Sequence, residues 1–200
     1  MVRACVILKA GKLLLGAVSI GLCLSTQSLA QIHASMSVFN HAIALPGPAI
    51  LSSAHLGADM GLTFYYKERS KHERFLHTQL GVYYQRLIHT GVQLYGEYHY
   101  RYRLARQLGI DGAVGLGGLS TVMATELFHL NEWGQYEATG RARMHVQASA
   151  AIGLTYGQRT QRFQPFVQYR FRVFTPFAKA YVPFVPCTSL HIGAFYRLNQ

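Results

Sequence analysis

Beyond residue 30 the sequence lacks any apolar run approaching the roughly 20 residues that a membrane-spanning helix needs. It is also poor in cysteine, and two of its three cysteines, Cys5 and Cys23, lie in the first thirty residues. Cys187 is then alone and has no partner for an intramolecular disulfide. A helical anchor and a disulfide scaffold are therefore both excluded for residues 31–200.

The first thirty residues have the layout of a secretory signal peptide. Arg3, Lys9 and Lys12 precede an apolar run over 13–22, and Ser28-Leu29-Ala30 places small residues where a signal peptidase cuts. We predict cleavage after Ala30, export, and a remaining chain of one domain. Acylation at Cys23 is disfavoured, because Leu22 stands where a lipoprotein signal needs a small residue.

Acidic residues are scarce. After residue 30 the chain has sixteen Lys and Arg against eight Asp and Glu, a net charge of +8. Nucleic acid is the usual partner of a basic chain, but an exported protein meets anionic lipid instead. We expect outer-membrane lipid and lipopolysaccharide as partners, and no nucleic acid. A solubilising role for the charge remains the alternative.

Apolar and polar residues alternate with a period of two over long segments, which a helix does not produce. Segment 56–66 puts apolar residues at even positions and polar or small residues at odd ones. The pattern predicts seven strands of roughly 10 to 14 residues, the length of tilted strands that cross a bilayer. These strands cover 55–66, 76–84, 88–102, 108–118, 144–156, 163–174 and 190–198.

Single-chain bacterial barrels have even strand counts, so an eighth strand is expected. We place it at 121–130, since a long unstructured connection would otherwise follow residue 119. The predicted fold is an all-β, antiparallel up-and-down transmembrane β-barrel over 54–200, after an irregular segment at 31–53. With both ends in the periplasm, the cell-surface connections are 68–74, 104–107, 131–141 and 176–187, and the periplasmic turns are 86–88, 119–120 and 157–162.

Under this fold the polar face lines the lumen. Eight strands leave space only for side chains, so we predict a hydrogen-bonded plug and no pore, cofactor or metal. Asp111 is expected opposite Arg101 or His99, depending on the length of the turn between the predicted strands 88–102 and 108–118. The predicted polar cluster of the lumen comprises Asp59, Glu97, His99, Arg101, Asp111, Arg170 and Arg172.

Segment 175–187 contains three prolines, which exclude it from a central strand ladder. We predict a surface loop that either folds over the lumen or meets lipid or a partner. Its predicted functional residues are Pro176, Phe177, Lys179, Tyr181, Pro183 and Pro186.

The chain resembles the small eight-stranded outer-membrane barrels of the OmpA/OmpX type. It is more closely similar to an outer-membrane barrel family to which no reaction is assigned, so the resemblance implies no catalytic residue. It also implies contact with periplasmic chaperones and the barrel-assembly machinery. The motifs that carry it are Leu80-Gly-Val-Tyr-Tyr84, Tyr100-Arg-Tyr102, Gly115-Leu-Gly117, Thr175-Pro-Phe177, Tyr181-Val-Pro183 and Leu190-His-Ile-Gly193.

The leading hypothesis is a non-enzymatic barrel of the Gram-negative envelope with a structural or surface-interaction role. One alternative is a lipid A-modifying enzyme. Its His-x-Ser signature is matched only by His33-Ala34-Ser35, inside the segment predicted to be irregular. The other alternative is a soluble, lipocalin-like lipid binder, whose apolar face would point inward.

Overall fold

The computed structural model describes residues 32–47, 55–68, 71–85, 89–125, 128–130, 133–138, 140–158, 160–176 and 184–198. The predicted signal peptide lies outside these residues. Within them, no helix has the length and apolar character needed to cross a membrane.

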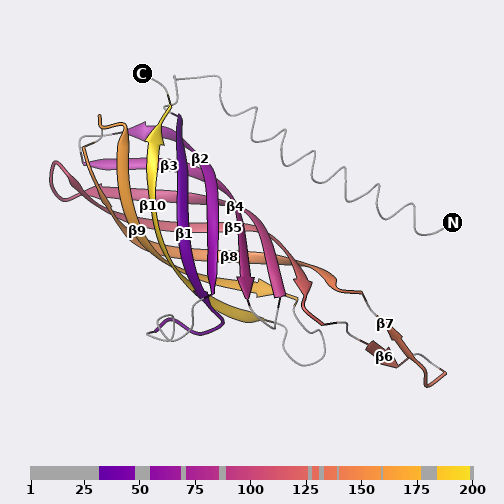
Figure 1. Ribbon diagram of the computed structural model, residues 1–200. Coiled ribbons are helices and arrows are strands. Elements are labelled where there is room, and N and C mark those ends of the chain that lie inside the picture. The colour runs from indigo at the N-terminus through magenta and orange to yellow at the C-terminus, as the bar shows by residue number, and fades with distance from the viewer. Residues whose placement is uncertain are drawn as a thin grey trace. The chain divides into compact units, whose positions relative to one another are not determined.

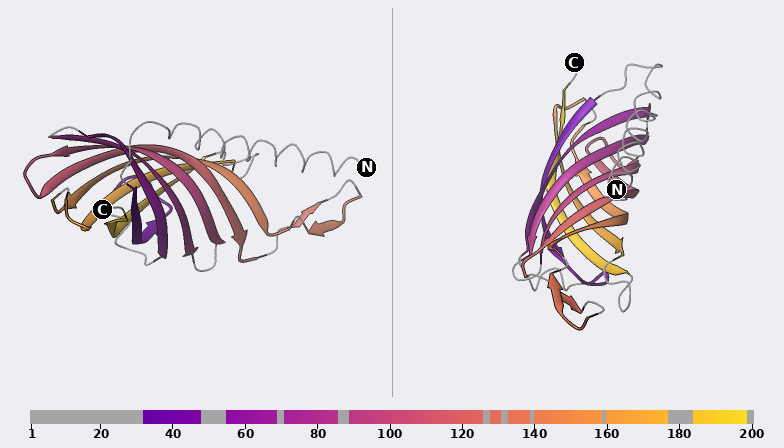
Figure 2. Two further views of the ribbon diagram at one scale, coloured as in Figure 1. Left: turned by 90° about the horizontal axis from the view of Figure 1, so that it is seen from above. Right: turned by 90° about the vertical axis from the view of Figure 1, so that its right-hand side faces the viewer.

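Eight long antiparallel strands form a closed barrel in the order β1-β10-β9-β8-β5-β4-β3-β2. Figure 1 shows them in sequence colours, and Figure 2 shows how they incline as they wrap around. The predicted up-and-down barrel is therefore confirmed. The long strands are β1 (Ile32–Ala42), β2 (Leu56–Glu68), β3 (His72–Gln85), β4 (His89–Arg103), β5 (Leu108–Met123), β8 (Ala142–Tyr156), β9 (Phe163–Thr175) and β10 (Val185–Arg197).

The period of two decides which side chains enter the barrel. On β2, Leu56 and Met60 are 70% and 58% exposed, whereas Asp59 and Thr63 are 3% and 0% exposed. The same division recurs on the other long strands, so the outer face is apolar and the lumen is polar. A soluble lipocalin-like barrel needs the opposite arrangement.

The prediction of an irregular segment at 31–53 is wrong, because β1 occupies residues 32–42 and closes the barrel. It pairs with β10 on one side and β2 on the other. Its alternation is present but weak. Met36 and Val38 point outward, while His33, Ser35 and Phe39 point inward.

The predicted eighth strand at 121–130 is also wrong. Residues 121–123 extend β5, and 124–141 connect β5 to β8. This connection contains its own short hairpin of β6 (Phe128–Leu130) and β7 (Tyr136–Ala138), which forms a separate two-stranded sheet. The connection after β5 is indeed structured, as expected, but its structure is this hairpin and not a barrel strand.

Because β1 was missed, some connections were assigned to the wrong end. The connections 69–71, 104–107 and 157–162 lie at the end where β1 begins and β10 ends, which we call the terminal end. The connections 43–55, 86–88, 124–141 and 176–184 lie at the opposite, far end. The predicted cell-surface connections 68–74 and 104–107 therefore lie at the terminal end, and the predicted periplasmic turn 86–88 lies at the far end. The predicted turn at 119–120 is wrong, because these residues lie inside β5. The far end now carries the longer connections, as outer-membrane barrels do.

Candidate functional site

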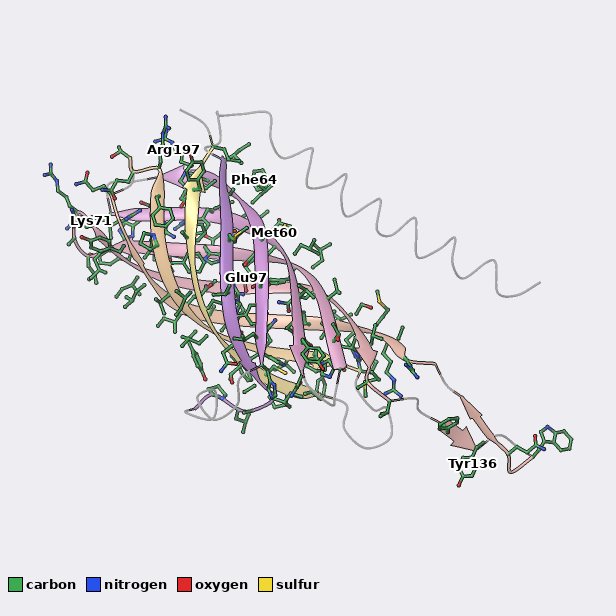
Figure 3. All side chains as sticks on the ribbon, in the orientation of Figure 1. Met60, Phe64, Lys71, Glu97, Tyr136 and Arg197 are labelled. Atoms are coloured by element: carbon green, nitrogen blue, oxygen red, sulfur yellow. The ribbon has the colours of Figure 1, made fainter. Side chains whose placement is uncertain are left out.

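The lumen holds four buried arginines and four buried carboxylates, so its formal charge is balanced within the described residues. Figure 3 labels Glu97 inside the barrel. Burying a charge is costly unless it is paired and hydrogen-bonded, and equal numbers make complete pairing possible. The eight residues are Asp59, Glu73, Glu97, Arg101, Arg103, Asp111, Arg170 and Arg172.

Arg101 organises the group nearest the terminal end. The register sets it opposite Asp111, and Arg101 Nε and Nη2 donate to the two Asp111 oxygens at 2.5 and 3.1 Å. Arg101 Nη1 lies 3.4 Å from Glu73 Oε2, and Arg103 Nε donates to Glu73 Oε1 at 2.8 Å. The Arg101 guanidinium also stacks on the Phe75 ring, 4.9 Å from its centroid. These bidentate and stacked contacts hold the arginine in one orientation.

Arg170 organises a second group, which contains two carboxylates. Its Nη2 donates to Glu97 Oε2 at 2.7 Å, and its Nη1 lies 3.6 Å from Asp59 Oδ2. Tyr95 Oη donates to Asp59 Oδ2 at 3.0 Å, and His191 Nδ1 lies 3.1 Å from the same oxygen. Strands β2, β4, β9 and β10 therefore meet through one guanidinium in the lumen.

Arg172 lies closer to the far end, where apolar side chains share the lumen with buried polar ones such as His41 and Gln147. It donates to Gln93 Oε1 and, at 3.2 Å, to Ser189 Oγ. The buried apolar residues that cluster around this level are Phe39, Tyr83, Leu119, Phe174, Val185 and Cys187. A gap that Arg172 and several of them line has no room for a water molecule.

Small residues stand opposite large ones across the lumen wall. Gly57 is the cross-strand partner of Phe39, and Gly91 is the partner of Tyr83. A Cβ atom at either glycine would overlap the aromatic ring. This alternation of small and large side chains fills the barrel to a packed interior.

All seven predicted lumen residues face inward. The structure brings Asp59, Glu97 and Arg170 together, with His99 Nε2 3.3 Å from Glu97 Oε2. It pairs Arg101 with Asp111, and it links Arg172 to Asp59 through Gln93, which accepts from Arg172 and donates to Asp59 Oδ1 at 3.1 Å. Glu73 was missed, because the strand containing it was predicted to begin at residue 76. Extending the odd-position pattern back to residue 73 would have found it.

The predicted surface loop is only partly described. Phe177, Lys179, Tyr181 and Pro183 lie outside the described residues. Pro176 accepts a hydrogen bond from His145 Nδ1 through its carbonyl oxygen at 2.6 Å. The assignment of Pro186 to the loop is wrong, since it is the second residue of β10 and lies opposite Val173. A proline is tolerated near the start of a strand.

Two arrangements in the lumen resemble reactive sites. His77, Glu97 and His99 offer ligand atoms within 4.8 Å of one another, but the Arg170 guanidinium already occupies Glu97 Oε2, and a second cation there would be repelled. Ser35 Oγ and His77 Nε2 are hydrogen-bonded at 2.6 Å. However, His77 Nδ1 has no hydrogen-bond partner among the described residues, so no carboxylate orients this ring as a catalytic triad requires.

No family model and no curated protein matches this sequence. Among solved structures, the neisserial surface protein NspA is 10% identical with a TM-score of 0.55, over 86% of this chain and 98% of that one. Ail of Yersinia pestis is 14% identical with a TM-score of 0.49, over 84% and 99%. The outer-membrane enzyme PagL is 8% identical with a TM-score of 0.45, over 83% and 99%. The likeness to NspA shows a shared fold, the eight-stranded barrel of outer-membrane proteins.

Proposed function

We propose that this chain is an integral outer-membrane barrel with a sealed lumen, and that its role is structural or in surface interaction. The observation that carries the proposal is the division of side chains between an apolar outer face and a charge-balanced, filled interior. The apolar outer face supports the membrane location, and the filled interior supports the sealed lumen.

The outer face supports residence in a bilayer. Leu116, Val114 and Ile152 are 70%, 60% and 62% exposed, and they belong to a continuous set of apolar residues on neighbouring strands. Such a surface is far larger than a soluble monomer exposes. Closing the sheet also leaves no unpaired strand edge in hydrocarbon.

The interior supports a barrel that does not conduct. Arg170 crosses the lumen to Glu97 on β4, Arg101 pairs with Asp111 on the neighbouring strand β5, and the far-end apolar residues pack beyond them. An ion would have to break these pairs to pass. The lumen residues therefore stabilise the fold and do not form a conduction path.

The β6–β7 hairpin supports a surface role. It pairs only with itself, and Figure 1 shows it past the ends of β5 and β8. Phe128, Trp133 and Tyr136 are 58%, 86% and 77% exposed on it. Aromatic residues of this kind are enriched in protein interfaces, so the hairpin is where we expect a partner to bind.

Membrane fractionation tests the location, and planar-bilayer recording tests the seal. We expect the protein in the outer-membrane fraction, heat-modifiable migration on a gel, and no single-channel openings after reconstitution. Recovery in the soluble periplasmic fraction would refute the membrane role, and regular channel openings would refute the sealed lumen. Mass spectrometry of lipid A with and without the gene should show unchanged acylation, and a lost or gained acyl chain would favour an enzyme.

A further inference from the structure

Charge outside the lumen is unevenly divided between the two ends of the barrel. By chain position, eight basic residues and one acid belong to the terminal end, whereas four basic residues and three acids belong to the far end. The terminal end thus carries +7 and the far end +1. The terminal-end residues are Lys67, Glu68, Arg69, Lys71, Arg74, Arg106, Arg159, Arg162 and Arg197, and the far-end ones are Arg86, Glu126, Glu132, Glu137, Arg141, Arg143 and Lys179.

Five of the terminal-end cations have described side chains, and we call them the cationic rim: Lys71, Arg74, Arg106, Arg162 and Arg197. The first four are exposed and Arg197 is half-buried. Figure 3 labels Lys71 and Arg197 at the end opposite Tyr136. They lie on β3, on β10 and in the connections β2–β3, β4–β5 and β8–β9, so they are distributed around the whole circumference.

The cationic rim begins where the apolar outer face ends. The Arg74 guanidinium lies 5.8 Å from the centroid of the Tyr100 ring, and Tyr100 Oη is hydrogen-bonded to His72 Nδ1 at 2.5 Å. The outward Tyr102 ring lies 5.2 Å from His72. Aromatic side chains with a polar tip prefer the level of the lipid headgroups, and the rim lies at this level or just beyond it.

We propose that the cationic rim binds the phosphates of anionic phospholipids in the leaflet that surrounds the terminal end. This inference rests on the proposed membrane location. Lipid encircles a barrel, and so does the rim, whereas a single bound protein would need the charges gathered on one side. In an outer membrane with the termini in the periplasm, this leaflet contains phospholipid and not lipopolysaccharide.

The test compares local lipid composition at the two ends of the folded, full-length protein. Trp133 is the only tryptophan, so a Trp133→Phe background accepts one reporter at a time. Tyr102→Trp reports the terminal end, and the outward, 61% exposed Tyr84 gives the matched far-end reporter, Tyr84→Trp. The vesicles contain phosphatidylcholine and a minor fraction of phosphatidylglycerol, and either lipid carries bromine to quench nearby tryptophan.

We expect brominated phosphatidylglycerol to quench the Tyr102→Trp reporter several-fold beyond its share of the vesicle, and the Tyr84→Trp reporter only in proportion to that share. The quadruple change Lys71→Gln, Arg74→Gln, Arg106→Gln and Arg162→Gln lowers the charge of the terminal end from +7 to +3 and should reduce the excess by at least half, and high salt should reduce it as well. The matched far-end change Arg86→Gln, Arg141→Gln, Arg143→Gln and Lys179→Gln should leave it intact. Heat-modifiable migration confirms folding of each variant.

Quenching of both reporters in simple proportion to composition would overturn the inference while leaving the membrane barrel standing. An excess that the quadruple change leaves undiminished would overturn it as well. If neither reporter were quenched by either brominated lipid, the membrane location itself would fail.

Discussion

Arg170 is the residue on which the central charges of the lumen depend. It contacts Glu97 at 2.7 Å and Asp59 at 3.6 Å, and all three side chains are buried. Arg170→Met keeps most of the volume but leaves two carboxylates without their cation. We expect a loss of about 3 kcal/mol or more in the free energy of unfolding, measured by denaturant titration of the reconstituted barrel.

Two variants control this prediction. Arg106→Met removes an exposed arginine and, in phosphatidylcholine vesicles that contain no anionic lipid, should change the stability by less than about 0.5 kcal/mol. Adding Glu97→Gln to Arg170→Met should cost much less than Glu97→Gln alone, because the unpaired carboxylate is removed. Additive losses in the double variant would show that the two side chains are not coupled.

Gly57 tests how tightly the lumen is packed. A Cβ atom at Gly57 would overlap the Phe39 ring, which is itself stacked on His191 with centroids 4.5 Å apart. Gly57→Val should therefore destabilise the barrel by about 1–3 kcal/mol in the same titration. The matched change is Gly96→Val on the outer face, where nothing lies within 4 Å of a new Cβ atom. Equal stability of the two variants would mean that the lumen is loosely filled.

The sequence predicts which residues enter the lumen, because inward positions follow from parity alone. It does not predict their partners beyond the nearest strand. Asp111 opposite Arg101 could be anticipated from one hairpin, with His99 as the alternative. The contact of Arg170 with Glu97 spans 73 residues, and it exists only because β9 and β4 face each other across a closed barrel.

Strands with strong alternation could be located from the sequence, and β1 shows where the pattern weakens. Ala34 and Asn40 give its outer face little apolar character, and the large Phe39 points inward, so the pattern is hard to recognise. One omitted strand also reversed the assignment of connections to the two ends. An error in the number of strands before a connection therefore places that connection at the wrong end of the barrel.

The β6–β7 hairpin is an element that the barrel does not use. It forms a sheet of its own, separate from the eight long strands. Replacing residues 125–139 with a short glycine-serine turn should leave heat-modifiable migration unchanged and should shift the free energy of unfolding by less than about 0.5 kcal/mol. By contrast, Ser37→Pro in β1 removes a ladder hydrogen bond from the closing strand and should abolish the compact gel form. Loss of the compact form in the hairpin deletion would show that the hairpin supports the barrel.

The whole molecule is organised to meet hydrocarbon on its outside. Leu116 is 70% exposed in the middle of β5, whereas Leu104 is 55% exposed in the connection after β4. Leu116→Lys should cost about 2–4 kcal/mol in a bilayer, and Leu104→Lys should cost about 1 kcal/mol or less, since charged residues are penalised by depth. Unfolding from phospholipid vesicles measures both, and equal costs would contradict the bilayer placement.

The balanced charges of the lumen also constrain the order of assembly. Before β1 meets β10, the sheet is open, and Arg170 on β9 has not reached Glu97 on β4 or Asp59 on β2. An open sheet in hydrocarbon would expose unpaired ions to lipid, which is far costlier than exposing them to water. Strand pairing and entry into the membrane must therefore proceed together, and a half-inserted sheet is not a stable resting point for this chain.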